Sequence, residues 1–352
     1  MSIGIAPRFS KSRVTKAGNN IRNNNPSQED LEVLENWRAS HSHVMNTFQA
    51  NLRRRSRGSD FLVGQRLKRR VTIIDKLTRQ PGMNLARMHD IAGCRVVFPT
   101  LNDLHAFRSE FIQSRARHER LTAERDQFNY ITQPKLSGYR GVHDVYRYQS
   151  YAKSSDAWSG LLIEIQYRTR AQHAWATAVE IADLLTKSRG KFSEGEEDYQ
   201  AFFQACSEII ARTKEDGHSC CADMSNSELI DFFEEKNHST NLLDILSRTN
   251  TVSSDLSERF FKKRLNIILI YPFDHSENPS DGTSILRVRS IKDTRRAIEE
   301  YEQLEEEMAG KADVVLVRAE DIDTLMKVFQ NYFTDARDFV SYVRAGLRAL
   351  AP

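Results

Sequence analysis

The sequence has few cysteines and no long apolar run. Four cysteines occur among 352 residues, two of them adjacent at Cys220 and Cys221, which gives no disulfide framework for a chain of this size. No apolar stretch approaches the roughly 20 residues that span a bilayer, and no apolar secretion signal is visible near residue 1. We therefore expect a cytoplasmic protein with reduced cysteines and no membrane partner. The spacing of His218, Cys220, Cys221 and Asp223 fits no common zinc pattern, so we interpret these cysteines as buried or incidental.

The sequence also lacks an excess of charge of one sign. It has 51 Lys and Arg against 48 Asp and Glu, a net charge of +3, which excludes a uniformly basic nucleic-acid coat. The charges are unevenly placed, however: residues 53–70 are rich in arginine and lysine, and Glu299 to Glu307 is strongly acidic. The acidic stretch fits a solvated helix face, or alternatively an intramolecular cover over the basic stretch.

The length suggests more than one domain, and the patterning predicts an α+β fold with a mixed β-sheet flanked by helices. Residues 1–28 are polar and predict a flexible leader. The predicted units are a main domain at 29–187, a helical connector at 188–255, with loop composition at 188–200, and a smaller α/β module at 256–352. The predicted helices of the main domain are 28–53, 63–77, 103–112 and 171–185, and its strands are 91–98, 139–149 and 161–168. The module is predicted to contain strands at 265–271, 284–288 and 313–317, a helix at 293–308 and two closing helices.

The strand at 161–168 is the most informative segment. Its apolar positions Leu161, Ile163, Ile165 and Tyr167 alternate with Leu162, Glu164, Gln166 and Arg168. With the period of two that a strand imposes, an acid, an amide and a guanidinium share one face, about 7 Å apart. Ordinary half-buried strands alternate too, but this composition suits the wall of a site for a phosphorylated, metal-bound substrate.

Four further segments carry candidate site residues. Arg66, Lys68 and Lys76 suit an oligophosphate, although a solvated basic helix face gives the same pattern. Asp90 precedes an apolar strand, a usual place for a magnesium ligand and equally for a cap. A loop through Pro134 and Gly138 carries Lys135 and Tyr139, and a tyrosine there either stacks on a base or packs as a surface aromatic. Gln172, His173 and Trp175 begin a helix and are predicted to close over the site.

Taken in order, these segments resemble the synthetase domain of the RelA/SpoT family, which makes the alarmone (p)ppGpp. The motifs are Arg-x-Lys from residue 66, Asp-Ile-Ala-Gly-x-Arg-Val-Val from 90, Tyr-Ile-x-x-Pro-Lys-x-x-Gly-Tyr-Arg-x-Val-His from 130, and Glu-Ile-Gln-x-Arg-Thr from 164. The resemblance covers about residues 40–185. It implies a nucleotidyltransferase-like fold and pyrophosphate transfer from ATP, with Mg²⁺, to the ribose 3′-hydroxyl of GDP or GTP.

The resemblance also implies a role for each matching residue. Arg66, Lys68 and Lys76 match the positions that hold the ATP phosphates and adenine. Asp90 matches a magnesium ligand, and Glu164 matches the acid that binds magnesium and activates the hydroxyl; these two are the catalytic candidates. The residues matched to the acceptor side are Tyr139, which stacks on guanine, and His143, Lys135, Gln166 and Arg168.

Departures from the family pattern leave the acceptor open. Asn129 stands where an acid is common, Asp75 where a basic residue is usual, and Val179 where many small synthetases have an acid. The alternatives are an adenosine nucleotide or a toxin-type reaction on the 3′ end of tRNA, which the arginines at 53–57 favour because tRNA needs an extended phosphate-binding surface. Asp90, Tyr139 and Glu164 argue against a third alternative, an inactive binding module.

About 60 residues precede the synthetase motifs, so we expect no hydrolase domain of the kind that long family members carry. A synthetase without its own hydrolase needs a restraint, either from an antitoxin or other regulatory partner or from its own C-terminal half. A homo-oligomer is also compatible with the sequence.

Overall fold

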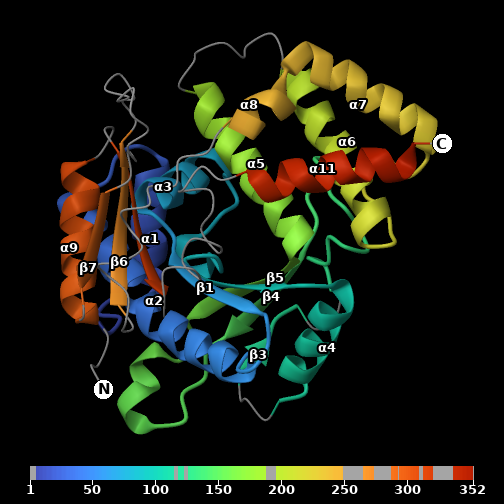
Figure 1. Ribbon diagram of the computed structural model, residues 1–352. Coiled ribbons are helices and arrows are strands. Elements are labelled where there is room, and N and C mark those ends of the chain that lie inside the picture. The colour runs from blue at the N-terminus through green and yellow to red at the C-terminus, as the bar shows by residue number, and fades with distance from the viewer. Residues whose placement is uncertain are drawn as a thin grey trace.

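The computed structural model describes residues 5–114, 118–122, 126–187, 196–248, 265–272, 287–291, 293–308, 312–319 and 336–351 (Figure 1). Parts of four sequence predictions lie outside these ranges: residues 1–4 of the leader, 188–195 of the predicted loop, 284–286 of a predicted strand, and one of the two closing helices.

A single mixed sheet organises the described part of the chain. Its strands are β1 (Leu62–Leu67), β2 (Ala92–Phe98), β3 (Glu119–Arg120), β4 (Val142–Arg147), β5 (Leu162–Thr169), β6 (Leu265–Pro272), β7 (Arg287–Ile291) and β8 (Ala312–Ala319). They are arranged in the order β3-β4-β5-β2-β1-β8-β6-β7. The pair β2–β5 is parallel, and the other described pairs are antiparallel. The predicted α+β class with a mixed sheet is confirmed.

Helices cover the sheet and extend beyond both ends. The helices are α1 (Lys11–Arg22), α2 (Gln28–Arg55), α3 (Arg70–Arg79), α4 (Leu101–Ile112), α5 (Arg170–Lys187), α6 (Glu196–Lys214), α7 (Asn226–Thr240), α8 (Leu242–Arg248), α9 (Thr294–Glu307) and α11 (Arg337–Leu350), with short 3-10 helices η1 (Leu85–Arg87) and η2 (Lys153–Trp158). Figure 1 shows α9 beside β6 and β7 at one end of the molecule, and α6, α7, α8 and α11 gathered at the other. No helix among the described residues is both long and apolar enough to cross a membrane.

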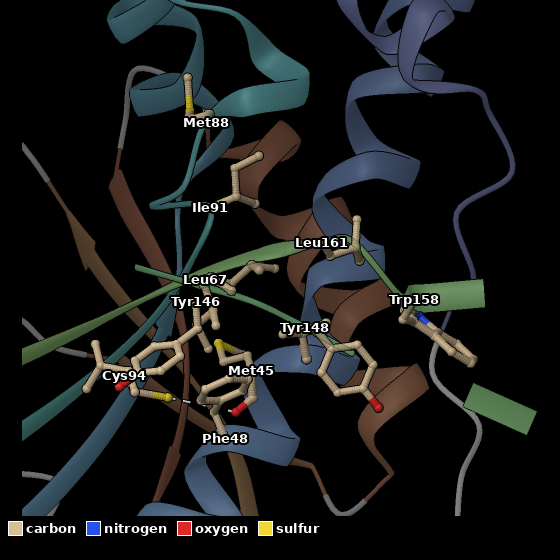
Figure 2. Packing of buried hydrophobic residues seen from close by; sticks show 14 of the residues in the cluster. Met45, Phe48, Leu67, Met88, Ile91, Cys94, Tyr146, Tyr148, Trp158 and Leu161 are labelled. Atoms are coloured by element: carbon tan, nitrogen blue, oxygen red, sulfur yellow. Dashed lines mark hydrogen bonds between the residues drawn. The ribbon is translucent and has the colours of Figure 1, made fainter. Parts of the chain in front are cut away.

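Helix α2 packs its apolar side against one face of the sheet. Figure 2 shows Met45 and Phe48 of α2 beside Cys94 of β2 and Tyr146 of β4, all buried. The Cys94 thiol lies 3.8 Å from the carbonyl oxygen of Met45. Because successive strand residues point to opposite faces, this apolar face leaves the alternate positions of β1, β2 and β5 for the other side of the sheet.

The predicted leader is wrong at residues 11–22, which form α1. Ser10 caps the helix by accepting a hydrogen bond from the backbone of Arg13. Val14, Ala17 and Ile21 are buried in the same core as α2 and the sheet. The steps of three and four between them are helical, but so few apolar residues in a polar stretch resembled a tail.

The predicted helix at 63–77 is also wrong in its first part. Residues 62–67 are strand β1, paired along its length with β2, and α3 begins only at Arg70. Val63 and Leu67 lie four residues apart, a spacing compatible with one face of a helix and also with one face of a strand. Pairing with β2 decides between the two. Likewise, residues 196–200 of the predicted loop begin α6, and Tyr139–Gly141 precede β4 instead of belonging to it.

The other described elements follow the sequence closely. The predicted strands at 91–98 and 161–168 match β2 and β5 to within a residue, and the predicted helix at 293–308 matches α9. Strand β8 joins the sheet beside β1, with Val317 opposite Arg66. The division of the chain near residues 187 and 255 stays a prediction.

Candidate functional site

A cavity of about 540 Å³ opens on the polar face of β1, β2 and β5. Eight of the ten predicted site residues line it: Arg66, Lys68, Lys76, Asp90, Lys135, His143, Glu164 and Gln166. The remaining two, Tyr139 and Arg168, join this group through hydrogen bonds described below. Residues up to a hundred positions apart in the sequence are thus brought to one place by the sheet and by α3.

Strand β5 presents the row of polar side chains that its alternation predicts. Glu164 and Arg168 are buried, whereas Ile163, Ile165 and Tyr167 pack into the core. Gln166 Nε2 donates to Glu164 Oε1 at 3.0 Å, and Arg168 Nη2 donates to Gln166 Oε1 at 3.3 Å. Glycine at position 93 is the β2 residue opposite Glu164, so no side chain from β2 fills the space beside the carboxylate.

Glu164 is held as an ionised carboxylate. His143 Nδ1 lies 2.6 Å from Glu164 Oε1. Burial acts to raise the pKa of Glu164, but the hydrogen bond and charge of His143, with His89 and Gln166, overcome it and lower that pKa to about 2. A carboxylate with such a low pKa is a weak proton acceptor but a good ligand for a cation and a good hydrogen-bond acceptor for a hydroxyl.

A chain of hydrogen bonds connects Glu164 to the tyrosine of the acceptor motif. The Tyr139 hydroxyl lies 2.6 Å from His143 Nε2, and Arg168 Nε donates to the same hydroxyl at 3.2 Å. The Arg168 guanidinium also lies 5.1 Å from the centre of the Tyr139 ring. We call Arg168, Tyr139, His143 and Glu164 the acceptor-side chain, because the first three match the acceptor side of the family motif and Glu164 is hydrogen-bonded to His143.

Two lysines hold Asp90 at the same cavity. Lys68 Nζ and Lys76 Nζ donate to Asp90 Oδ2 at 3.0 and 2.9 Å. Burial acts to raise the pKa of Asp90, but the two ammonium groups lower it below its ordinary value. The other carboxylate oxygen, Oδ1, is buried without a hydrogen-bond partner, so it is available to a ligand.

These carboxylates fit a magnesium ion. Magnesium takes oxygen ligands, and it is typically bound by one or two carboxylates together with substrate phosphates. Asp90 supplies a buried oxygen without a partner, and Glu164 supplies an ionised carboxylate lining the same cavity. The described residues contain no group of three or more His, Cys, Asp and Glu that would hold a metal without a substrate, and this includes the sequence around Cys220 and Cys221.

Helix α6 holds the loop between Pro134 and Gly141 in place. Ser207 of α6 donates to the carbonyl oxygen of Gly138 at 2.6 Å. Gly138 has a φ of +87°, and a Cβ there would lie 3.0 Å from the Ser207 Cβ. On the cavity side, Lys135 Nζ lies 4.3 Å from the ring centre of Tyr130 and 5.1 Å from that of Tyr139.

The start of α5 does not close over the cavity, so that prediction is wrong. Gln172, His173 and Trp175 are buried and lie outside its lining. Gln172 donates to Glu215 at 3.1 Å, and Trp175 Nε1 donates to the carbonyl oxygen of Phe203 at 2.8 Å. These residues face α6 because α5 packs its apolar side against the α6 helix.

His89 is a cavity residue that the sequence reasoning missed. Its Nε2 lies 3.8 Å from Glu164 Oε2, and burial lowers its pKa. Its position directly before Asp90, a predicted ligand, was a signal in the sequence that could have identified it. Phe128, Tyr130, Arg95 and Glu180 also line the cavity.

Comparisons with known proteins agree with the motifs. Residues 65–190 match the region found in RelA / SpoT proteins. GTP pyrophosphokinase YjbM of Bacillus subtilis (strain 168) is 33% identical over 120 residues, which are 34% of this chain and 53% of that protein. The chain therefore spans about half the length of this curated relative.

Similar solved structures include small alarmone synthetases. Small alarmone synthetase 1 from Bacillus subtilis bound to its product pppGpp is 26% identical, with a TM-score of 0.41, over 50% of this chain and 90% of that one. A GTP pyrophosphokinase family protein from Streptococcus pneumoniae is 22% identical, with a TM-score of 0.40, over 60% and 97% of the two chains. The ten predicted site residues all fall within residues 65–190, the stretch that matches the region found in RelA / SpoT proteins.

Proposed function

We propose that this protein is an ATP:nucleotide 3′-pyrophosphotransferase that makes (p)ppGpp from ATP and GDP or GTP. One observation carries the proposal: Lys68, Lys76 and Asp90 line the same cavity as His143 and Glu164, which belong to the acceptor-side chain. The relative named GTP pyrophosphokinase and the synthetase structure bound to pppGpp support it. A site for this reaction needs cations for a triphosphate and an acid for a hydroxyl, and both are present.

On the donor side, Arg66, Lys68 and Lys76 bind the ATP phosphates. Arginine binds phosphate oxygens with two parallel hydrogen bonds, and each lysine supplies a compact positive charge. Lys68 and Lys76 already converge on Asp90 and are exposed by only 20% and 18%, so their charges are poorly screened by solvent. Magnesium, held by Asp90 and Glu164, would neutralise phosphate charge and order the oxygens.

On the acceptor side, Tyr139 stacks on the base and Glu164 accepts a hydrogen bond from the ribose 3′-hydroxyl. The 3′-oxygen attacks the β-phosphorus of ATP, the bond from that phosphorus to the α-β bridging oxygen breaks, and AMP leaves. Glu164 orients the hydroxyl, and the hydroxyl proton passes to the phosphate of the departing AMP. Phosphoryl transfer of this kind depends mainly on positioning and charge neutralisation, which agrees with a Glu164 that orients more than it removes protons.

A second candidate keeps the chemistry and changes the acceptor to the 3′ end of tRNA or an adenosine nucleotide. A second surface pocket of about 540 Å³, at the end of α2, favours a larger acceptor. Arg54, Arg55, His118 and Tyr151 are among its lining residues, and Tyr151 is 58% exposed. An exposed arginine, Arg54, beside an exposed aromatic ring suits a polynucleotide strand.

The remaining partners follow from the same proposal. A synthetase of this kind needs restraint, and we expect an antitoxin or regulatory protein, a cytoplasmic location and a possible homo-oligomer. Co-purification of the full chain from its own cell extract, followed by light scattering of the purified protein, tests both the partner and the oligomer.

Incubation of the full chain with labelled ATP and Mg²⁺ tests the acceptor. GDP, GTP, adenosine nucleotides and bulk tRNA are supplied in separate reactions, and the products are resolved by chromatography and gel electrophoresis. Label in a guanosine nucleotide supports the first proposal, and label in RNA or an adenosine nucleotide supports the second. No transfer to any acceptor, by protein with an intact circular dichroism spectrum, overturns both.

A further inference from the structure

Helix α3, which carries Lys76, has no side-chain cap of its own. The residue before its first turn is Arg69, whose side chain makes no capping hydrogen bond. The first backbone N–H groups of a helix have no partner within the helix and need one from elsewhere. Other helices in this chain solve the problem locally, as Ser27 does for α2 and Ser225 for α7.

The cap for α3 comes from the far end of the chain. Glu305 of α9 accepts a hydrogen bond from the backbone N–H of Arg70 at 2.8 Å, although the two residues are 235 positions apart. Glu305 is buried, with 7% of its surface exposed. A carboxylate at this place satisfies a donor and also complements the positive end of the helix dipole.

Arg38 of α2 connects Glu305 to the segment that carries Lys68. Its Nη2 donates to Glu305 at 2.7 Å, and its Nε donates to the carbonyl oxygen of Lys68 at 3.0 Å. Its Nη1 donates to Glu35 at 2.6 Å, and its guanidinium lies 4.7 Å from the ring centre of Tyr301. We call Glu35, Arg38, Tyr301 and Glu305 the α2–α9 cluster.

The cluster lies beside the cavity without lining it. None of the cavity-lining residues comes from α9, so the acidic stretch does not cover the ATP side. The exposed acids Glu299, Glu306 and Glu307 form the solvated face that the sequence predicts, whereas Tyr301, Leu304 and Glu305 are buried. The interpretation as a cover is therefore wrong, and the interpretation as a solvated face is wrong only on the side of α9 that tertiary packing turns inward.

The α2–α9 cluster contacts the two segments that carry Lys68 and Lys76. Glu305 fixes the first residue of α3, whose later turn carries Lys76, and Arg38 fixes the backbone of Lys68. Both ammonium groups meet at Asp90. Strand β8 adds a second connection from the same part of the chain, because it pairs with β1 opposite Arg66.

We propose that Glu305 is a positioning residue for the donor: it caps α3 from the C-terminal part of the chain and, through Arg38, sets the lysines that bind the ATP phosphates. The kinetic part of this inference rests on the proposed function. The acceptor-side chain has no contact with the cluster in the structure, so the effect is specific to ATP.

The test compares Glu305→Ala and Glu305→Gln with Glu299→Gln, a control on the same helix whose side chain is 58% exposed. Since loss of a helix cap costs on the order of one kcal/mol, we expect the KM for ATP to rise about fivefold in Glu305→Ala. Glu305→Gln keeps a hydrogen-bond acceptor for the backbone N–H of Arg70, so we expect its KM for ATP to rise less. The acceptor KM and kcat stay within about twofold of the parent chain, as expected for a ground-state binding effect.

Hydrogen exchange supplies a readout that does not need activity. We expect the backbone amide of Arg70 and its neighbours in the first turn of α3 to exchange faster in Glu305→Ala than in the parent chain or in Glu299→Gln. If the parent chain shows no transfer at all, the proposed function fails, while exchange still decides whether Glu305 caps α3. An unchanged exchange rate, an unchanged KM for ATP, or an equal rise of both KM values overturns the inference. If Glu305→Ala does not fold, Glu305→Gln carries the same comparison.

Discussion

The residues proposed to bind the donor and those proposed to bind the acceptor differ in what supports them. The donor lysines depend on α2 and α9, through Arg38 and Glu305. The acceptor loop depends on α6, through the Ser207 hydrogen bond to Gly138. Both α6 and α9 lie outside the matched residues 65–190. The difference teaches that each half of the site is completed by a different later part of the chain, so each half can be weakened without the other.

The largest expected effect comes from changing Glu164, the group proposed to act on both the donor and the acceptor. Glu164→Gln keeps the shape and loses the charge that holds a cation and orients the hydroxyl, so kcat is expected to fall about 10³-fold or more. Steady-state transfer from labelled ATP measures it. Glu119→Gln, on β3 with its side chain 46% exposed, is the control and is expected to keep full activity. A Glu164→Gln variant with near-normal kcat contradicts the assignment.

The second effect concerns stability on the acceptor side. Glu215 near the end of α6 is buried and contacts Arg140, Thr169 and Gln172. Glu215→Ala leaves Arg140 buried without its charged partner, which is expected to cost about 3 kcal/mol of unfolding free energy. Chemical denaturation of the full chain measures this cost. Asp231→Asn, at an exposed position of α7, is the control, and equal midpoints for the two variants would show that the Glu215 contacts do not stabilise the fold.

The third effect separates the two halves kinetically. Gly138→Ala places a side chain at a φ of +87° and a Cβ 3.0 Å from the Ser207 Cβ, so the loop must move. We expect the acceptor KM to rise about tenfold, since left-handed strain and crowding cost one to a few kcal/mol, with the KM for ATP unchanged. Gly82→Ala, where an added Cβ meets nothing within 4 Å, is the control. Equal changes in both KM values would remove the distinction between the halves.

The smallest effect concerns the pH dependence of the donor-side support. Burial raises the pKa of Glu302 on α9 to about 7. The negative charges of Glu35, Glu305 and Glu299 raise this pKa further, whereas the positive charge of Arg38 lowers it. The folded chain thus keeps a proton that the unfolded chain releases above about pH 4.5, so this group lowers stability progressively as pH rises from about 4.5 to 7.

Glu302→Gln removes that titration. We expect its Tm to exceed that of the parent chain by about 2–4 °C at pH 8 and to equal it at about pH 3, where Glu302 is protonated in both the folded and the unfolded state. Differential scanning calorimetry at both pH values measures the shift. Glu307→Gln, at an exposed position of the same helix, is the control, and a Tm difference that does not change with pH contradicts the assignment.

The sequence predicted the residues that line the cavity better than the contacts from α2, α6 and α9 that hold them in place. Glu164, Gln166 and Arg168 were identified together because a strand repeats every two residues, and β5 keeps that pattern without interruption. Asp90 and Lys135 lie in short local motifs, and they reach the cavity as expected. Their roles in binding ATP, the acceptor and magnesium stay predictions.

The misses share a physical cause. The contact from Glu305 to Arg70 spans 235 residues, and no local period or spacing reveals a partner that distant. Trp175 was expected over the cavity because it lies at the start of a predicted helix, but packing between α5 and α6 turns it inward. The spacing of Val63 and Leu67 is compatible with a helix and with a strand, and only the pairing of β1 with β2 decides between them.

The place of β1 in the sheet has a consequence for synthesis of the chain. It lies between β2 and β8, so its second neighbour emerges from the ribosome about 250 residues later than β1 itself. Pairing across such a separation is slow, because a long loop must close before the contact forms. Until then β1 presents an open edge of unpaired N–H and C=O groups, which can recruit strands from other chains. We therefore expect nascent chains that stop before residue 312 to aggregate and to depend on chaperones. In the finished chain, β8 pairs with β1 and covers that edge.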